Sequence, residues 1–152
     1  MSIELYVFPP SPRAFKTMAV ANHLGLEWTL HMLDLPKGEH MTPQYGALNP
    51  NLRMPTLKDG DYVLWESNSI MRYLNLAYGK ASPIYPQDAK GRAAVDRWLD
   101  WTLSSLQPVD RPVFWGLVRT PPEQRDMAAL QNAADAAAAR AKWFGAAAGR
   151  WA

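Results

Sequence analysis

The stretch IELYVFPPSPRAFKTMAVANHLG, residues 3–25, contains the first strand and the first helix of the predicted fold. Every second residue at its start is aliphatic, which is typical of a strand over residues 3–8. Apolar residues then follow helical spacing as far as Gly25, and glycine commonly ends a helix because it adopts a left-handed backbone. Ser11 therefore lies at the junction of strand and helix.

Two interpretations of Ser11 follow from this position. The start of a helix offers unpaired backbone N–H groups and the positive end of the helix dipole, so an anion is stabilised there. The Ser11 hydroxyl can cap the helix, with Pro12 as its first residue, or it can stabilise a bound thiolate, or both.

The pattern continues outward from this stretch. Residues 28–33 form a second strand, predicted to be parallel to the first because a helix connects them. Strands at 56–58 and 62–65 flank Asp-Gly-Asp at 59–61, which is a hairpin signal. Ser67 then caps a helix with an apolar stripe. Strand, helix, strand, hairpin and helix in this order indicate a thioredoxin-like α/β domain over residues 1–78.

After this domain the strand pattern disappears. Residues 79–88 contain a glycine and two prolines without any periodicity and are predicted to be a linker. A helix follows over residues 95–106, loosened near Pro108 and Pro112 because proline lacks the N–H of a helical bond, and it resumes to about Arg119.

A second long helix is expected in the alanine-rich segment. Thr120-Pro121-Pro122-Glu123 is predicted to be a capping box that opens this helix, which runs to about Phe144. Residues 145–152 are expected to be frayed. Residues 89–152 would then be an all-α domain, an incomplete helical bundle.

Composition limits the function. The 152 residues are 48% hydrophobic and 20% charged, as in ordinary globular proteins. The net charge is only +2 and the basic residues are scattered, so we expect no nucleic-acid partner. Neither a signal peptide nor an apolar run of about 18 residues is present, so we expect no membrane association and a cytoplasmic location.

The cysteine and histidine content excludes further kinds of functional site. The chain has no cysteine, which excludes disulfides, Cys-x-x-Cys redox centres and thiolate nucleophiles. Its three histidines, His23, His31 and His40, lack metal-ligand spacing, so no metal is expected.

Two motifs carry a family resemblance. LNPNLRMPTL at 48–57 and VLWESNSI at 63–70 follow the strand and the Ser-Pro helix in order. This arrangement resembles the soluble glutathione transferase family, and specifically its bacterial serine-type, theta-like members. The resemblance is dense over residues 3–78 and loose over 88–144.

The resemblance implies a role for Ser11. Its hydroxyl and the helix start would favour the glutathione thiolate, the nucleophilic form of the thiol. Ser11 stands where cysteine-type members carry their thiol. Tyr6, on the other face of the strand, is expected to pack rather than act like the catalytic tyrosine of tyrosine-type members. Arg13 departs from the serine-type pattern, and it either stabilises the thiolate or extends into solvent.

The resemblance also implies residues that bind the rest of glutathione. The Met54-Pro55 bond is expected to be cis, so that the Met54 backbone pairs with the cysteinyl backbone like an added strand; without the resemblance, a trans proline starting a strand would be expected. Ser67 would bind the γ-glutamyl carboxylate and Glu66 the α-ammonium, although Ser67 is also a good helix cap.

Further residues are assigned to the two ends of the site. His40 and Arg53 would hold the glycine carboxylate of glutathione, although His40 alone would be an ordinary loop histidine. The second substrate would lie between the domains, against an apolar wall of prolines and aromatic residues that at helical spacing also suit a core. This wall comprises Pro9, Pro10, Trp101, Phe114 and Trp115.

The sequence therefore predicts a glutathione transferase that conjugates its co-substrate, glutathione, to a hydrophobic small-molecule electrophile, as a homodimer without a metal. The alternative is a non-catalytic glutathione transferase-like binding or stress-regulatory module. Thiol-disulfide exchange would require glutathione to supply all the sulfur.

A last expectation concerns the helical part. The resembled family continues for several more helices, so we expect this chain to be C-terminally shortened, either as a truncated product or as a form that self-associates through residues 95–144. An uncovered apolar face usually marks an interface or a liability. The helical part is expected to open more easily than residues 3–78.

Overall fold

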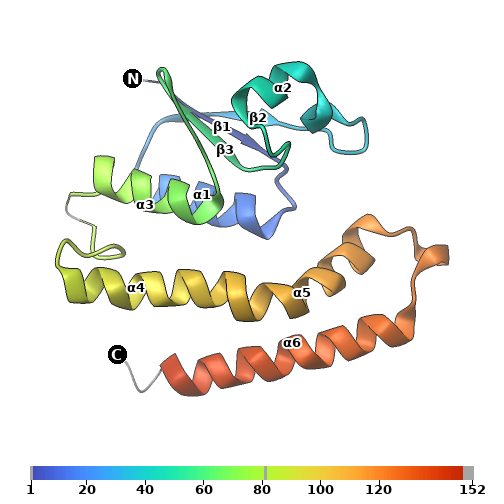
Figure 1. The fold of residues 1–152 in the computed structure, drawn as a ribbon. Helices are drawn as coiled ribbons and strands as arrows, with labels where there is room; N and C mark the ends of the chain where they lie inside the picture. Colours follow the sequence, from blue (N-terminus) through green and yellow to red (C-terminus); the bar gives the residue numbers. More distant parts are fainter. Residues whose placement is uncertain (1, 81, 149–152) are drawn as a thin grey trace. The chain divides into compact units, whose positions relative to one another are not determined.

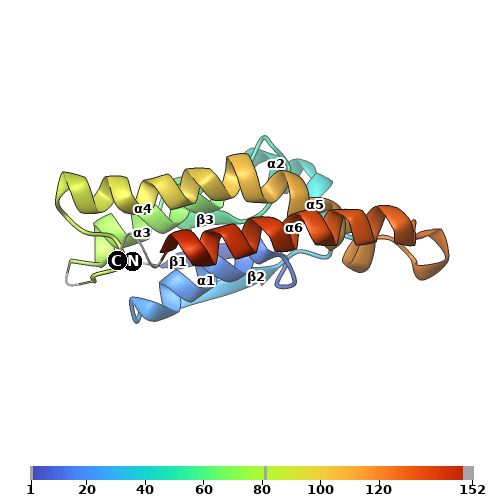
Figure 2. The same ribbon diagram turned by 90° about the horizontal axis from the view of Figure 1, so that it is seen from below.

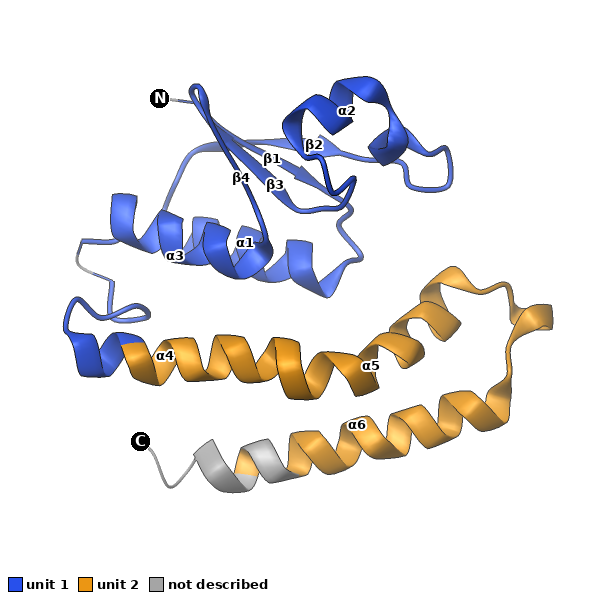
Figure 3. Cartoon of the chain, in the orientation of Figure 1, with its two compact units in different colours: residues 1–92 blue, residues 93–152 orange. Residues whose placement is uncertain are grey.

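The computed structural model describes residues 2–80 and 82–148. The chain divides into two compact units, residues 1–92 and 93–152 (Figure 3). The linker predicted at residues 79–88 lies within the first unit, and helix α4 (Ala89–Trp101) crosses the boundary between the units. The domain boundaries drawn from the sequence therefore stay a prediction, and each unit is described by itself.

The first unit contains a four-stranded sheet in the order β2-β1-β3-β4. β1 is parallel to β2 and antiparallel to β3, and β3 is antiparallel to β4. Helices α1 and α3 lie on one side of the sheet and α2 on the other (Figure 1). This is the predicted thioredoxin-like arrangement. The elements are β1 (Ile3–Val7), α1 (Pro12–His23), β2 (Trp28–Met32), a 3-10 turn (Glu39–Met41), α2 (Pro43–Leu48), β3 (Thr56–Asp59), β4 (Tyr62–Trp65) and α3 (Ser67–Tyr78).

The core of this unit lies between the sheet and the helices α1 and α3. Leu5 and Val7 are fully buried, while the residues between the aliphatic positions of β1 are only partly covered. They pack with Ala14 of α1 and with Ile70 and Leu74 of α3, all of which are fully buried. Burial of one such leucine contributes about 1.5–3 kcal/mol. The alternation that predicted the strand thus also specifies its core face.

Glycines terminate α1 and turn the hairpin, as predicted. Gly25 has a φ of 65°, and the N–H groups of Gly25 and Leu26 donate to the carbonyls of Asn22 and Ala21. These two bonds form a Schellman motif, which satisfies the last carbonyls of the helix. Gly60, between β3 and β4, has a φ of 58°.

The start of α3 differs from the expectation that Ser67 caps it. Glu66 occupies the N-cap position with the unusual backbone angles φ 75° and ψ 114°, and Ser67 is the first helical residue. The prediction was wrong by one residue, because the left-handed φ of Glu66 completes the turn from β4 within that residue, and its carbonyl already accepts the Ile70 N–H.

The second unit is helical. α4 is followed by a π-helical turn (Thr102–Leu106), α5 (Gln107–Phe114) and a second π-helical turn (Trp115–Arg119). The predicted end at Arg119 is confirmed. The predicted loosening lies beside the prolines and not at them: α5 is regular across Pro108 and Pro112, although each lacks the N–H of a helical bond, and the π-helical turns flank it. The last helix, α6 (Met127–Ala148), runs back beside α5 (Figure 2).

The predicted start of α6 is wrong. Pro121 and Arg125 have extended backbone, a 3-10 turn covers Pro122–Gln124, and α6 begins at Met127. The Arg125 guanidinium donates to the carbonyls of Thr120 and Leu117 and folds this loop back, so no capping box opens a helix there. Asp126 caps α6 instead, accepting the Ala129 N–H at 2.9 Å.

The expected frayed tail is partly wrong as well. α6 continues past Phe144 and includes residues 145–148. The remaining tail, residues 149–152, lies outside the described residues.

Candidate functional site

Ser11 lies at the junction of β1 and α1, as predicted. It occupies the N-cap position, is only 9% exposed, and its backbone N–H donates to the Phe8 carbonyl at 2.8 Å. Its hydroxyl makes no cap hydrogen bond, however. The plain capping interpretation therefore accounts for the backbone of Ser11 but not for its side chain.

The Met54-Pro55 peptide bond is cis, which confirms the prediction. Two buried side chains hold the segment before it. The Tyr45 hydroxyl donates to the Arg53 carbonyl at 2.7 Å, and the Asn49 amide donates to the same carbonyl at 2.6 Å. Burial of Tyr45 raises the pKa of its hydroxyl, so it stays a neutral donor.

Asn49 also ties this segment to β3. Its amide donates to the Thr56 hydroxyl at 3.0 Å, and its side-chain oxygen accepts the Asn51 N–H at 3.0 Å. Sequence reasoning assigned no role to Asn49 or Tyr45. The Asn49-Pro50 pair is a local turn signal. The hydrogen-bond partners of Asn49, at Arg53 and Thr56, come beside it only because the chain folds back.

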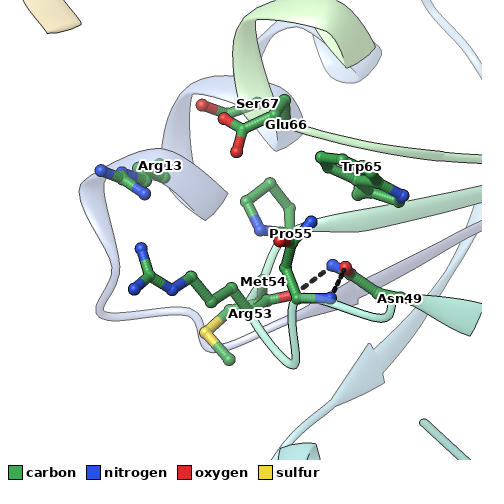
Figure 4. Close-up of a pocket in the computed structure, with 9 residues that line it drawn as sticks. Arg13, Asn49, Arg53, Met54, Pro55, Trp65, Glu66 and Ser67 are labelled. Atoms are coloured by element: carbon green, nitrogen blue, oxygen red, sulfur yellow. Dashed lines mark hydrogen bonds between the residues drawn. The ribbon is translucent and has the colours of Figure 1, made fainter. Parts of the chain in front are cut away.

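A surface pocket lies between this segment and the start of α3 (Figure 4). It brings together five residues predicted to bind glutathione, with Pro55 and Ser67 buried and Glu66 exposed at the surface. The lining residues are Arg13, Asn49, Asn51, Arg53, Met54, Pro55, Trp65, Glu66 and Ser67.

Arg13, whose role the sequence left open, is one of these lining residues and is half-buried. It lies in the first turn of α1, so the pocket is bordered by the starts of both α1 and α3. Helix starts and guanidinium groups both stabilise anions.

His40 and Ser11 are not among the residues that line this pocket. His40 belongs to the 3-10 turn Glu39–Met41, and among the described residues its buried Nδ1 atom has no hydrogen-bond partner. The structure thus brings Arg53 to the pocket without His40, whose assignment stays a prediction.

Lys16 is a charged residue near the pocket that sequence reasoning missed. Its ammonium donates a hydrogen bond to the side-chain oxygen of Asn68. Burial lowers the pKa of Lys16 to about 8, with Arg13 and Arg72 adding to the lowering and Glu66 opposing it. No local signal marks Lys16, because its partner lies 52 residues away in the chain.

Tyr6 packs on the other face of the sheet, as expected. Its ring stacks on His31 with centroids 4.4 Å apart, and its hydroxyl donates to Glu4 at 3.1 Å. Burial and this carboxylate raise the pKa of the Tyr6 hydroxyl. Tyr6 is absent from the pocket lining.

The residues predicted to bind the second substrate belong to different units. Pro10 is an exposed residue of the first unit, whereas Trp101, Phe114 and Trp115 belong to the second. Trp101 contacts Trp98 edge to face at 5.8 Å. The second-substrate pocket stays a prediction.

Among residues 2–80 and 82–148, no group of three or more metal-ligating side chains comes together. In the same part of the chain, no helix has both the length and the apolar character needed to cross a membrane.

Together, the fold and the pocket define a thioredoxin-like domain with a cis Met54-Pro55 bond at the edge of a surface pocket, followed by a helical region. The domain family "Glutathione S-transferase, N-terminal domain" matches residues 1–75. The crystal structure of the theta class glutathione S-transferase from Xanthomonas axonopodis pv. citri with glutathione bound is 41% identical, with a TM-score of 0.89, and the match covers 95% of this chain and 69% of that one. The chain belongs to the glutathione S-transferase family.

Curated relatives agree with this assignment. Glutathione S-transferase GstB of Escherichia coli is 37% identical over 137 residues, covering 76% of this chain and 65% of the relative. Glutathione S-transferase D7 of Anopheles gambiae is 42% identical over 106 residues, covering 70% of this chain and 49% of the relative. The chain thus spans about half to two thirds of the length of these relatives.

Proposed function

We propose that this protein binds glutathione in the pocket of Figure 4 and transfers its thiolate to a hydrophobic electrophile. The observation that carries the proposal is the meeting of two peptide-binding features in one pocket. The first is the Met54-Pro55 cis bond, and the second is the start of α3 with Glu66 and Ser67. The similar theta class glutathione S-transferase, whose structure has glutathione bound, supports glutathione as the ligand of this pocket.

Each part of glutathione has a complementary group here. The Met54 backbone pairs with the cysteinyl backbone, as a strand added to a sheet edge would. Ser67, at the start of α3, binds the γ-glutamyl carboxylate, and the Glu66 carboxylate binds the α-ammonium. Arg53 binds the glycine carboxylate, with His40 as a second donor.

Ser11 is proposed to activate the sulfur. A free thiol has a pKa of about 8.5, and a hydrogen bond from the Ser11 hydroxyl plus the helix start favour the thiolate. With an aryl halide, the sulfur lone pair forms a carbon–sulfur bond, the halide leaves with the electrons of the broken carbon–halogen bond, and the thiol proton passes to solvent.

The remaining assignments are proposed with the same function. Pro10, Trp101, Phe114 and Trp115 would contact the electrophile, whose apolar surface they match. The active form would be a cytoplasmic homodimer that detoxifies electrophiles without a metal.

Two measurements on the purified chain test the function. We expect retention on glutathione resin, release by free glutathione, and formation of the conjugate from glutathione and an aryl halide above the uncatalysed rate. Retention without turnover would support the alternative, a non-catalytic binding module. The absence of both retention and turnover would contradict the proposal.

A further inference from the structure

Lys16, the fifth residue of α1, connects this helix to the first turn of α3. Its ammonium donates to the side-chain oxygen of Asn68, the second residue of α3, which is only 3% exposed. α1 and α3 pack against each other on one side of the sheet (Figure 1). Ser11 immediately precedes α1, and Ser67 begins α3. The bond therefore joins the elements that carry the two ends of the proposed site.

The charges around Lys16 are unbalanced. Arg13 on its own helix and Arg72 on α3 disfavour the positive charge of Lys16, whereas Glu66, among the described residues, favours it. Burial adds to the cost, and together these effects lower the pKa of Lys16 to about 8. A half-buried cation in this setting is stabilised by an added anion.

A bound glutathione would add such an anion. In the proposed function, the γ-glutamyl carboxylate binds at Ser67, one residue before the partner of Lys16. The ligand's α-ammonium would at the same time engage Glu66, the carboxylate whose charge favours protonated Lys16.

We propose that Lys16 is a positioning residue of the glutathione site, which fixes the start of α3 against α1 through Asn68 and favours the γ-glutamyl carboxylate by its charge. This inference rests on the proposed function. It assigns Lys16 no contact with the reacting sulfur. Lys16 affects glutathione binding indirectly, by its hydrogen bond to Asn68 and by the positive potential that it creates at Ser67.

A pH dependence follows from this role. The ligand's γ-glutamyl carboxylate favours the charged form of Lys16, and the ligand's α-ammonium is paired with the Glu66 carboxylate. The ligand therefore binds more tightly to protonated Lys16 and raises its pKa. Affinity is therefore highest below about pH 8, the pKa of Lys16 in the free protein, and falls as the pH rises through that value.

The test measures binding of S-methylglutathione, whose sulfur does not titrate, by calorimetry between about pH 6.5 and pH 9, and it compares each variant with the wild type at the same pH because the ligand's α-ammonium also titrates in this range. We expect Lys16→Met to weaken binding about tenfold near neutral pH, with a difference from the wild type that shrinks as the pH rises through about 8. Lys16→Arg should keep most of the affinity, and its affinity relative to the wild type should rise through the same pH range, because guanidinium stays charged. Asn68→Ala should weaken binding, and Lys80→Met, an exposed lysine, is the matched control.

The outcomes separate this inference from the proposed function. Absence of binding by the wild type would count against the proposed function, on which this inference depends. If the wild type binds S-methylglutathione and the affinity of Lys16→Met is within about twofold of the wild-type affinity, this inference is overturned while the proposed function stands. If Lys16→Met does not fold, Lys16→Arg decides, because an affinity that falls in parallel with the wild type through pH 8 would assign the titration to another group.

Discussion

At the residue scale, Ser11 is the proposed source of thiolate activation. It is buried at the start of α1, yet its hydroxyl does not cap that helix. We expect Ser11→Ala to lower kcat for conjugation at least about tenfold, or about 1.4 kcal/mol of transition-state stabilisation, with little change in glutathione affinity. Steady-state kinetics with Ser2→Ala as control measure this. An unchanged kcat would mean that another group activates the sulfur.

The second prediction at this scale concerns Glu66 and Ser67, which both line the pocket at the start of α3. We expect Glu66→Gln and Ser67→Ala each to weaken glutathione binding by about 1–3 kcal/mol, because each removes a partner of a charged ligand group. Calorimetry is the measurement, with Glu27→Gln, an exposed glutamate, as control. Equal affinities for wild type and both variants would leave these residues with a structural role only.

At the element scale, the segment before β3 depends on Asn49. This residue is 2% exposed and bonds to Arg53, Thr56 and Asn51. Asn49→Ala should lower the free energy of unfolding by about 1–3 kcal/mol, because buried partners lose their hydrogen bonds. It should also weaken glutathione binding by displacing Met54. Urea denaturation measures the first effect, with the exposed Asn132→Ala as control; stability equal to wild type would show that Tyr45 alone holds the segment.

At the scale of the whole molecule, the two units differ in burial. Among the described residues, every fully buried side chain lies between Ile3 and Tyr85, in the first unit. Local opening is easier where few apolar side chains are buried. Both units expose large apolar residues, and those of the second unit are Leu103, Trp115, Leu117, Val118 and Met127.

We therefore expect amide hydrogen exchange to be faster in residues 95–144 than in residues 3–78, and we expect self-association through the helical part. Mass spectrometry of exchange and the mass in solution measure both. Uniform protection in a monomer would show that the helical part is stable without a partner.

Sequence alone determined the local features of this protein. The alternation in β1, the stop at Gly25 and the turn at Gly60 depend on neighbours within a few residues, and each appears in the structure. The cis bond before Pro55 was inferred from a family motif, since base rates for proline favour trans. The start of α6 was not predictable, because Arg125 folds the preceding loop back onto the carbonyls of Leu117 and Thr120.

Only the tertiary structure decided how the candidate site is held. The bond of Lys16 to Asn68 joins residues 52 apart, and burial between two helices sets the pKa of Lys16. Asn49 likewise became a structural residue only when folding placed the Arg53 carbonyl and Thr56 beside it. Patterns along a chain report intrinsic conformational preference, whereas hydrogen-bond partners, desolvation and charge environment depend on which distant segments come together.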